Sequence, residues 1–347
     1  MNPYRVGIVG LSWITSEPAN PGTHPAIGAA PPHSHLSALA AIPNVNVIAG
    51  CDISTEAQSL FHERWDATWP GANTYTDFRE MLAQEQIDLL CVATPDHLHG
   101  DVVRVAAESG VKAIFCEKPM STNLADVDSM IAAIDAHGVV VNVNNTRRWV
   151  ATYVAARERV RAGDIGTLSH ISVHFGGERA MLWRNHSHFL DLFNYFSESN
   201  PSWVMGELEP GFENCGTTSG GNGGRDAHLE PGVNAYIAFE NGVRGFLGGL
   251  KSATQQITVD LRGSTGRIVV DDQSASLITV TEHGISATPI IPRGTRFGMH
   301  AAIADLINAL DTGEAPQCPP GEARKTVVLI EGVLASQAAG NAKIVLG

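Results

Sequence analysis

The sequence contains no cluster of lysine and arginine, no Cys-x-x-Cys pair and no apolar stretch of membrane-spanning length. Its 347 residues carry a formal net charge of −13, so binding to nucleic-acid phosphates or to an anionic membrane surface is not expected. The 5 cysteines are odd in number and widely spaced, which predicts neither a disulfide framework nor a thiolate zinc site. Because the N-terminus also lacks the layout of a signal peptide, we expect a soluble, cytoplasmic protein.

The chain does contain enough apolar residues for two cores, which predicts two domains, at 1–145 and 146–347. In the first, continuous apolar runs alternate with helical patterns, as in a parallel sheet that is buried on both faces. The sequence therefore predicts a doubly wound α/β unit, the Rossmann fold. Its strands are predicted at 4–10, 45–51, 87–94, 112–117 and 139–144, and its helices at 34–42, 55–65, 75–84, 97–109 and 123–136.

The second domain has a different pattern, in which short strands follow one another through Gly and Asn turns. This pattern predicts an α/β domain with one large, mainly antiparallel sheet. Strands are predicted at 168–175, 234–250, 255–263, 266–272 and 276–284, and helices at 151–162, 186–197, 298–311 and 321–338. The last two helices could return to cover the first domain. Two long loops, 17–32 and 215–224, are expected to be functional or mobile.

A dinucleotide-binding turn is indicated where the first strand ends, because such a fold binds pyrophosphate on backbone N–H groups there. Gly10 takes the first glycine position of the fingerprint, Ser12 replaces the second and Thr15 stands at the third. Trp13 and Ile14 are expected to contribute to the same cofactor-binding turn. Taken alone, this spacing fits an ordinary strand-to-loop turn equally well, since the Pro-rich insertion delays the helix that should follow.

Asp52 ends the second strand, where an acidic side chain can accept hydrogen bonds from the adenosine ribose hydroxyls. Its carboxylate would repel a 2′-phosphate, and no Arg follows within several residues, so NAD is predicted in preference to NADP. Ile53 is expected to lie beside the same part of the cofactor. An Asp that caps the next helix is a compatible interpretation.

Two further loops follow strands and should reach the same edge of the sheet, where ligands bind in open α/β folds. They read VATPDHLHG at 92–100 and CEKPM at 116–120. Their residues predicted to line the cofactor crevice are Thr94, Pro95, His97, His99, Glu117 and Lys118.

These motifs occur in an order that resembles the glucose-fructose oxidoreductase / inositol dehydrogenase / MocA family over nearly the whole chain. They are GIVGLS at 7–12, CD at 51–52, TPDHLH at 94–99, EKP at 117–119, RRW at 147–149, AGDIG at 162–166 and HFLD at 188–191. The resemblance implies a Rossmann domain plus an α/β domain with a large open sheet, often used for oligomer contacts. It implies oxidation of a secondary alcohol of a sugar, sugar acid, polyol or inositol, or reduction of the ketone, with NAD. A homodimer or homotetramer through the C-terminal sheet is expected.

The resemblance also assigns roles to residues. Lys118 would contact the reacting hydroxyl, and His188 would accept its proton, which suits a side chain with an ordinary pKa near 6.5. The Lys118 ammonium would stabilise developing alkoxide charge. Glu117 and Pro119 would shape the nicotinamide pocket. Arg148 and Trp149 would lie near the substrate or the nicotinamide.

One position departs from the family pattern, which often has Asp four residues before the catalytic His. Here that position is Arg184, which would bind an anionic substrate group. Asp191, three residues after His188, would share a helix face with it, and both a role in orienting the ring and a structural role remain open. Arg184 and Asp191 are thus predicted, with Arg148 and Trp149, to be the substrate-binding residues.

Other classes of function compete with this prediction. The pairs His33/His35, His97/His99 and His186/His188 suggest a metal-dependent hydrolase, but they fall in loops or at helix starts, where side chains two apart diverge, and no metal is predicted. A dinucleotide-sensing regulator is a second alternative, and an NAD-dependent enzyme that cleaves glycosidic bonds is a third. The sequence leaves open which sugar or polyol, which carbon and which direction.

Overall fold

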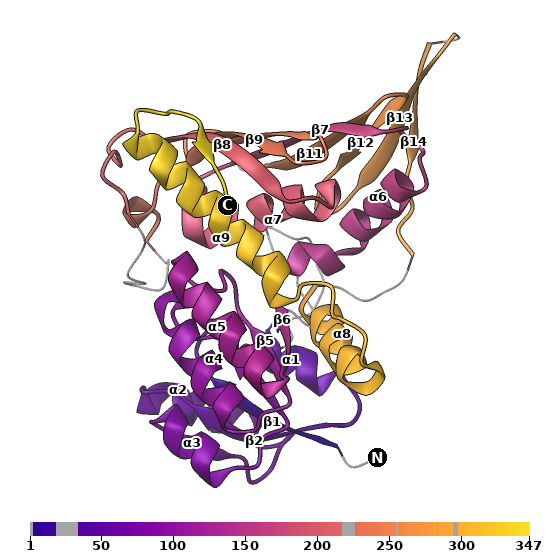
Figure 1. Ribbon diagram of the computed structural model, residues 1–347. Helices are drawn as coiled ribbons and strands as arrows, with labels where there is room; N and C mark the ends of the chain where they lie inside the picture. Colours follow the sequence, from indigo (N-terminus) through magenta and orange to yellow (C-terminus); the bar gives the residue numbers. More distant parts are fainter. Residues whose placement is uncertain (1–2, 19–33, 217–225, 255, 283, 294–297) are drawn as a thin grey trace. The chain divides into compact units, whose positions relative to one another are not determined.

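The computed structural model describes residues 3–18, 34–216, 226–254, 256–282, 284–293 and 298–347. Most of the predicted loops 17–32 and 215–224 therefore lies outside the described residues. The chain forms two compact units (Figure 1). Described residues of the first lie in 3–18, 34–146 and 298–323, and those of the second in 147–293 and 324–347.

The first unit contains a six-stranded sheet in which every pairing is parallel. The order across the sheet is β3 (Asn73–Tyr75), β2 (Val45–Cys51), β1 (Tyr4–Val9), β4 (Leu89–Val92), β5 (Ala113–Cys116) and β6 (Val140–Val143). This is the doubly wound order, so the predicted Rossmann fold is confirmed. The direction of winding reverses between β1 and β4, and ligands bind at such a switch point.

The prediction was wrong about β3, which the sequence analysis did not include. Its three residues lie at the edge of the sheet, where Asn73 is exposed and the other two are half-buried, and they form no apolar run. The predicted helix 75–84 starts later, at Phe78. Asp77 ends the extended segment and caps this helix, because its carboxylate accepts a hydrogen bond from the N–H of Arg79 at 2.9 Å.

The helices of the first unit agree with the predicted positions to within a few residues. They are α1 (His35–Ala40), α2 (Thr55–Trp65), α3 (Phe78–Gln84), α4 (His99–Glu108), α5 (Leu124–His137) and α8 (Gly298–Thr312), with a 3-10 turn, η1 (Asp96–Leu98), before α4. The delayed start of α1 is confirmed, with Ser34 as its cap. α8 packs on α1 and β6, where the Asn142 amide donates to the Ala302 carbonyl at 2.9 Å.

The second unit contains a nine-stranded sheet. Its order is β14 (Gly284–Pro289), β13 (Ala275–Thr281), β12 (Gly266–Val270), β11 (Ile257–Gly263), β7 (Leu168–Gly176), β10 (Arg244–Leu250), β9 (Val233–Phe239), β8 (Pro201–Leu208) and β15 (Ile344–Val345). Only β7 and β10 pair in parallel among these described strands, which confirms the mainly antiparallel sheet. Three of these strands were not predicted: β8 contains Gly206, β14 is exposed throughout, and β15 has two residues.

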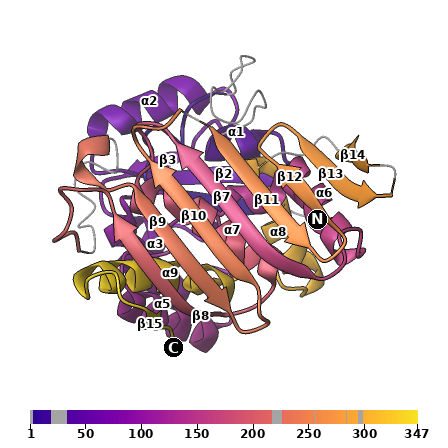
Figure 2. The same cartoon turned by 90° about the horizontal axis from the view of Figure 1, so that it is seen from above.

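Helices cover one face of this sheet: α6 (Ala151–Arg161), α7 (Ser187–Ser197) and the part of α9 (Pro320–Ala338) that belongs to the second unit. Trp183, Phe193, Leu261 and Val333 are among the fully buried residues of the core between them. Figure 2 shows the opposite face, on which none of the described helices of this unit lies. No described helix is both long and apolar enough to span a bilayer.

Candidate functional site

The loop that follows β1 begins with a close approach between two backbones. Gly10 has φ +93°, and a Cβ atom there would lie 2.5 Å from the carbonyl oxygen of Ala93, at the end of β4. Its N–H donates to the Cys51 carbonyl of β2 at 2.8 Å. Only glycine can adopt this dihedral angle and also avoid the clash with Ala93. The first position of the predicted dinucleotide turn therefore requires glycine for a steric reason.

In a typical dinucleotide-binding fold, the free N–H groups at the start of the first helix bind the pyrophosphate, and here those groups already have partners. The first two N–H groups of α1, on His35 and Leu36, donate to the carbonyls of Ile14 and Thr15, at 3.0 and 2.9 Å. The start of α1 is therefore satisfied by the protein itself. These two N–H groups are therefore not available to a phosphate group. In the loop before them, Trp13 adopts the left-handed conformation with φ +44°.

Asp52 joins the loops after β1 and β2. One of its carboxylate oxygens accepts the N–H of Leu11 at 2.8 Å, and the other accepts the N–H of Ser54 at 2.9 Å. The helix cap is Ser54, whose hydroxyl accepts the Ala57 N–H, so Asp52 supports the cap without forming it. Ile53 is 89% exposed beside it. The carboxylate is thus fixed in orientation at the end of β2.

The loops after β4 and β5 are joined by His99, which is buried. Its Nε2 lies 2.9 Å from the Thr94 carbonyl oxygen and its Nδ1 lies 2.9 Å from that of Pro119. Burial lowers the pKa of His99, so the ring is neutral near pH 7 and donates one of these two hydrogen bonds at a time. The buried hydroxyl of Thr94 has no hydrogen-bond partner among the described residues. Pro95 and His97, by contrast, are exposed.

Glu117 is buried at the end of β5 and is held as a carboxylate. Burial opposes its ionisation, but the His35 ring at 3.0 Å, the charge of Lys118 and the Asn144 amide at 2.7 Å outweigh that cost and lower the pKa of Glu117 to about 2. A fixed negative charge therefore precedes Lys118 in the chain. The peptide bond from Lys118 to Pro119 is cis.

Sequence reasoning missed these two partners of Glu117. Asn144 is the last residue of the predicted strand 139–144 and directly follows the observed β6, at the same edge of the sheet, a signal that could have included it. His35 was considered only as half of a metal-binding pair, and its neighbour His33 lies outside the described residues. Across the described ranges, no group of three or more His, Cys, Asp or Glu side chains is arranged to hold a metal ion.

In the second unit, His188 lies in the first turn of α7. A π-helical turn, Leu182–His186, runs directly into this helix, and the N–H of His186 donates to the carbonyl of Met181, five residues earlier, at 2.9 Å. Such π-helical turns are rare and occur often at functional sites. The observed helical segment therefore begins at Leu182, four residues before the predicted helix 186–197.

Arg148 and Asp191 pair with each other. The Nε and a terminal nitrogen of the Arg148 guanidinium donate to different oxygens of the Asp191 carboxylate, each at 2.8 Å. The two side chains are 2% and 1% exposed. Trp149 is also buried. Direct contact of these three residues with substrate stays a prediction; in this structure the two charges bind α7 to the segment that precedes α6.

Arg184 lies in the π-helical turn, and its side chain is partly exposed. Its backbone N–H donates to a carboxylate oxygen of Glu230 at 3.1 Å. Glu230 is buried, and sequence reasoning missed it because it lies 46 residues away along the chain, in a loop without a recognisable pattern. An acidic group is thus present beside the position where the family often has Asp.

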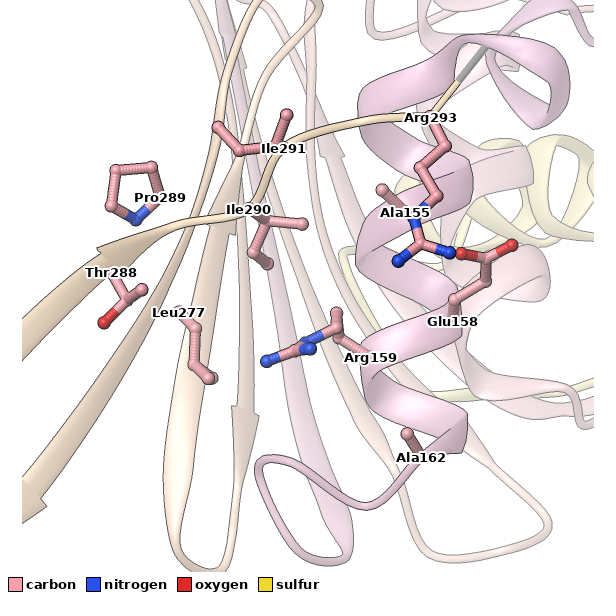
Figure 3. A pocket seen from close by; sticks show the side chains of 10 residues that line it. All are labelled: Ala155, Glu158, Arg159, Ala162, Leu277, Thr288, Pro289, Ile290, Ile291 and Arg293. Atoms are coloured by element: carbon pink, nitrogen blue, oxygen red, sulfur yellow. The ribbon is translucent and has the colours of Figure 1, made fainter.

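A separate cavity of about 520 Å³ lies in the second unit, between α6 and the hairpin of β13 and β14 (Figure 3). None of the predicted site residues lines it. Figure 3 shows the Arg159 side chain extending from α6 toward the hairpin. The lining residues are Ala155, Glu158, Arg159, Ala162, Leu277, Thr288, Pro289, Ile290, Ile291 and Arg293.

Comparison with known proteins agrees with the geometry of the first unit. Residues 4–145 match the model of the glucose-fructose oxidoreductase / inositol dehydrogenase / MocA family, described as an oxidoreductase family with an NAD-binding Rossmann fold. Residues 4–145 are thus similar to that oxidoreductase family, and the resemblance predicted from the motifs is confirmed for this part of the chain.

Two curated relatives and one solved structure illustrate the family. D-apiose dehydrogenase of Paraburkholderia graminis is 34% identical over 134 residues, which are 39% of this chain and 34% of that protein. D-xylose 1-dehydrogenase [NADP(+)] of Haloarcula marismortui is 26% identical over 165 residues, 48% of this chain and 41% of that protein. The matches thus span less than half of these relatives. Aldose-aldose oxidoreductase from Caulobacter crescentus has the same fold over 99% of this chain and 100% of its own, with a TM-score of 0.79 at 18% identity.

Proposed function

We propose that this protein is an NAD-dependent oxidoreductase that transfers a hydride between a nicotinamide and a secondary alcohol or ketone of a sugar, sugar acid, polyol or inositol. One observation carries the proposal. Gly10, Asp52 and the Glu117-Lys118 pair all follow strands of one parallel sheet, at the edge where such sheets bind ligands. The names of the relatives that act on apiose and xylose support the class of substrate.

The residues at this edge fit a dinucleotide. The glycine-only approach at Gly10 keeps side-chain bulk out of the turn, and the Thr94 hydroxyl at the same edge has no hydrogen-bond partner among the described residues. Asp52 accepts one N–H on each oxygen and retains lone pairs for ribose hydroxyls. Its charge disfavours a 2′-phosphate, which supports NAD over NADP. When bound, the nicotinamide would supply the carbon that accepts or donates the hydride.

The chain's own residues would handle the proton and the charge. His188 would take the proton of the reacting hydroxyl, and the Lys118 ammonium would stabilise the negative charge that develops on the oxygen. Glu117 is ionised at neutral pH because its pKa is lowered to about 2 by His35, Lys118 and Asn144 despite burial. It would offset part of the lysine's charge and favour the protonated ammonium. The second unit would carry most of the substrate contacts.

The uncovered face of the nine-stranded sheet supports a homo-oligomer. Four aromatic rings follow one another across neighbouring strands of that face: Trp203 to Tyr236 at 5.0 Å, Tyr236 to Phe246 at 4.9 Å and Phe246 to His170 at 6.0 Å. Phe246 is 40% exposed. A dimer or tetramer that buries this row should be weakened by Phe246→Asp, which sedimentation at several concentrations would detect.

The runner-up function is cleavage of a glycosidic bond with transient oxidation, which uses the same cofactor site. Product analysis without net NADH formation would identify it. A regulator that only senses the dinucleotide is the third possibility, and it would bind NAD without turnover of any sugar.

The experiment that tests the proposed function is NADH absorbance across a panel of inositols, aldoses, sugar acids and polyols. We expect at least one substrate-dependent increase with NAD. Lys118→Ala and His188→Ala should each reduce its rate by roughly 10²–10⁴-fold, while NAD binding by His188→Ala largely persists. Turnover on the true substrate that survives His188→Ala would contradict the assigned base.

A further inference from the structure

The helix that carries His188 begins without a cap from its own sequence. Met181 stands at the N-cap position and provides no side-chain hydrogen bond. The first N–H groups of any helix have no partner within the helix, and a buried start needs acceptors from elsewhere. Leu182 and Trp183, which begin this helix, are fully buried.

The acceptors come from a segment nearly fifty residues further along the chain. The carbonyl of Pro231 accepts the N–H of Leu182 at 2.9 Å. One oxygen of the Glu230 carboxylate accepts the N–H groups of both Trp183 and Arg184, at 2.8 and 3.1 Å. Three successive N–H groups are thus satisfied by two adjacent residues, and one of the acceptors carries a negative charge.

This capping segment, residues 230–232, is itself fixed. The Lys251 ammonium donates to the Glu230 carbonyl at 2.5 Å and pairs with the Glu209 carboxylate at 2.9 Å. The same Glu209 oxygen accepts the N–H of Gly232 at 3.0 Å. Glu230, of which 6% is exposed, therefore does not carry a mobile surface charge.

We propose that Glu230 is a positioning residue for His188, which fixes the start of its helix and places a negative charge on the N–H groups of Trp183 and Arg184. The inference rests on the proposed function. His188 is the seventh residue of this continuous helix, one turn beyond the N–H groups that Glu230 accepts. The buried carboxylate therefore acts on the His188 ring through its own negative charge, which favours the imidazolium and makes His188 a stronger base.

Other charged groups contact the same helix and also contribute to the electrostatic environment of His188. Asp191 is paired with Arg148, and the Arg147 guanidinium lies 4.7 Å from the centre of the Phe189 ring. Lys251 acts on His186, whose pKa is lowered chiefly by burial and further by that ammonium. These groups are the same in wild type and in the Glu230 variants, so a difference between the proteins reports the effect of Glu230.

The test compares Glu230→Gln and Glu230→Ala with wild type. Glutamine keeps the oxygen that accepts the N–H groups, replaces the other oxygen by an amide nitrogen and removes the charge. The melting temperature of Glu230→Gln should therefore stay near that of wild type, whereas Glu230→Ala should lower it. With Glu230→Gln, the acidic limb of the kcat/KM profile should move down by about half a pH unit, from the size of helix-terminus effects, with KM little changed. An unchanged limb would overturn the proposal.

A matched control is Glu209→Gln, which removes a carboxylate from the same cluster but not from the helix N–H groups. It should shift the limb less than Glu230→Gln, and an equal shift would contradict the specific role of Glu230. NMR titration of ¹³C-labelled histidines in the full chain, with His188 assigned from His188→Gln, gives a second readout that needs no turnover. A His188 titration that moves in Glu230→Gln supports the inference even if the proposed substrate class is wrong, and one that does not move overturns it.

Discussion

Arg148 and Asp191 form a bidentate ion pair that is buried on both sides and lies one helical turn from His188. Arg148→Met should lower the free energy of unfolding by about 3–5 kcal/mol, because it leaves a buried carboxylate without its counter-charge. The double variant Arg148→Met/Asp191→Leu should cost less than either single variant. Urea titrations measure all three.

Arg161→Met provides the exposed control for this prediction. Its guanidinium pairs with Glu198 at 2.6 Å, but the side chains are 57% and 40% exposed. Its loss should cost no more than about 1 kcal/mol. If Arg148→Met instead left stability unchanged and raised only the Michaelis constant, Arg148 would be a substrate ligand and not a structural charge.

Gly10 and Gly71 allow a matched test of the dinucleotide turn. Both have positive φ, of +93° and +83°, but a Cβ atom at Gly71 would meet nothing within 4 Å. Gly71→Ala should lower the free energy of unfolding by about 1 kcal/mol, because only the positive φ is unfavourable for alanine there. Gly10→Ala should cost at least twice as much and weaken NAD binding at least tenfold, as measured by calorimetry. Equal effects of the two substitutions would refute the close-approach argument.

His186 makes the second unit sensitive to acid. Burial, and then the charge of Lys251, lowers the pKa of His186 to about 3, whereas an unfolded histidine titrates near 6.5. The unfolded chain therefore takes up the proton first, and stability falls as the pH drops below 6.5. The loss should reach about 2 kcal/mol by pH 5.

His186→Leu removes this protonation step. Relative to wild type, the variant should gain stability as the pH is lowered from 7 to 5, in urea titrations at fixed ionic strength. Parallel pH dependence of the two proteins would show that His186 does not titrate with this sign.

Asp52 tests the choice of cofactor. Asp52→Asn keeps an acceptor for one backbone N–H but removes the negative charge, so NAD affinity should fall about tenfold or more, as for hydrogen bonds to charged groups. NADP affinity should fall less or rise, which narrows the gap between the two. Equal affinity of the unmodified protein for NAD and NADP would contradict the assignment.

Local signals explain which parts of this structure the sequence predicts. The α2 helix occupies 55–65 as predicted, because the Ser54 cap and the apolar residues Phe61 and Trp65 are local features. The buried runs that form β1, β4 and β5 are equally local. By contrast, β3 pairs at a sheet edge without an apolar run, and its existence depends on β2.

The missing parts of the candidate site have the same cause. Glu230 reaches the N–H of Arg184 from 46 residues away, and His35 reaches Glu117 from 82 residues away. No spacing rule predicts such pairs, because the folded chain creates them. The motif at Glu117-Lys118 could be predicted from its strand, whereas its charge balance required the structure.

The central claim is net hydride exchange between a carbinol carbon and the nicotinamide, and isotope tracing tests it most directly. A substrate that carries deuterium on the reacting carbon should transfer that deuterium to the cofactor, and mass spectrometry should find one deuterium per NADH formed. The rate should also fall relative to the undeuterated substrate. Product formation with the cofactor recovered as unlabelled NAD would contradict the account and favour glycoside cleavage instead.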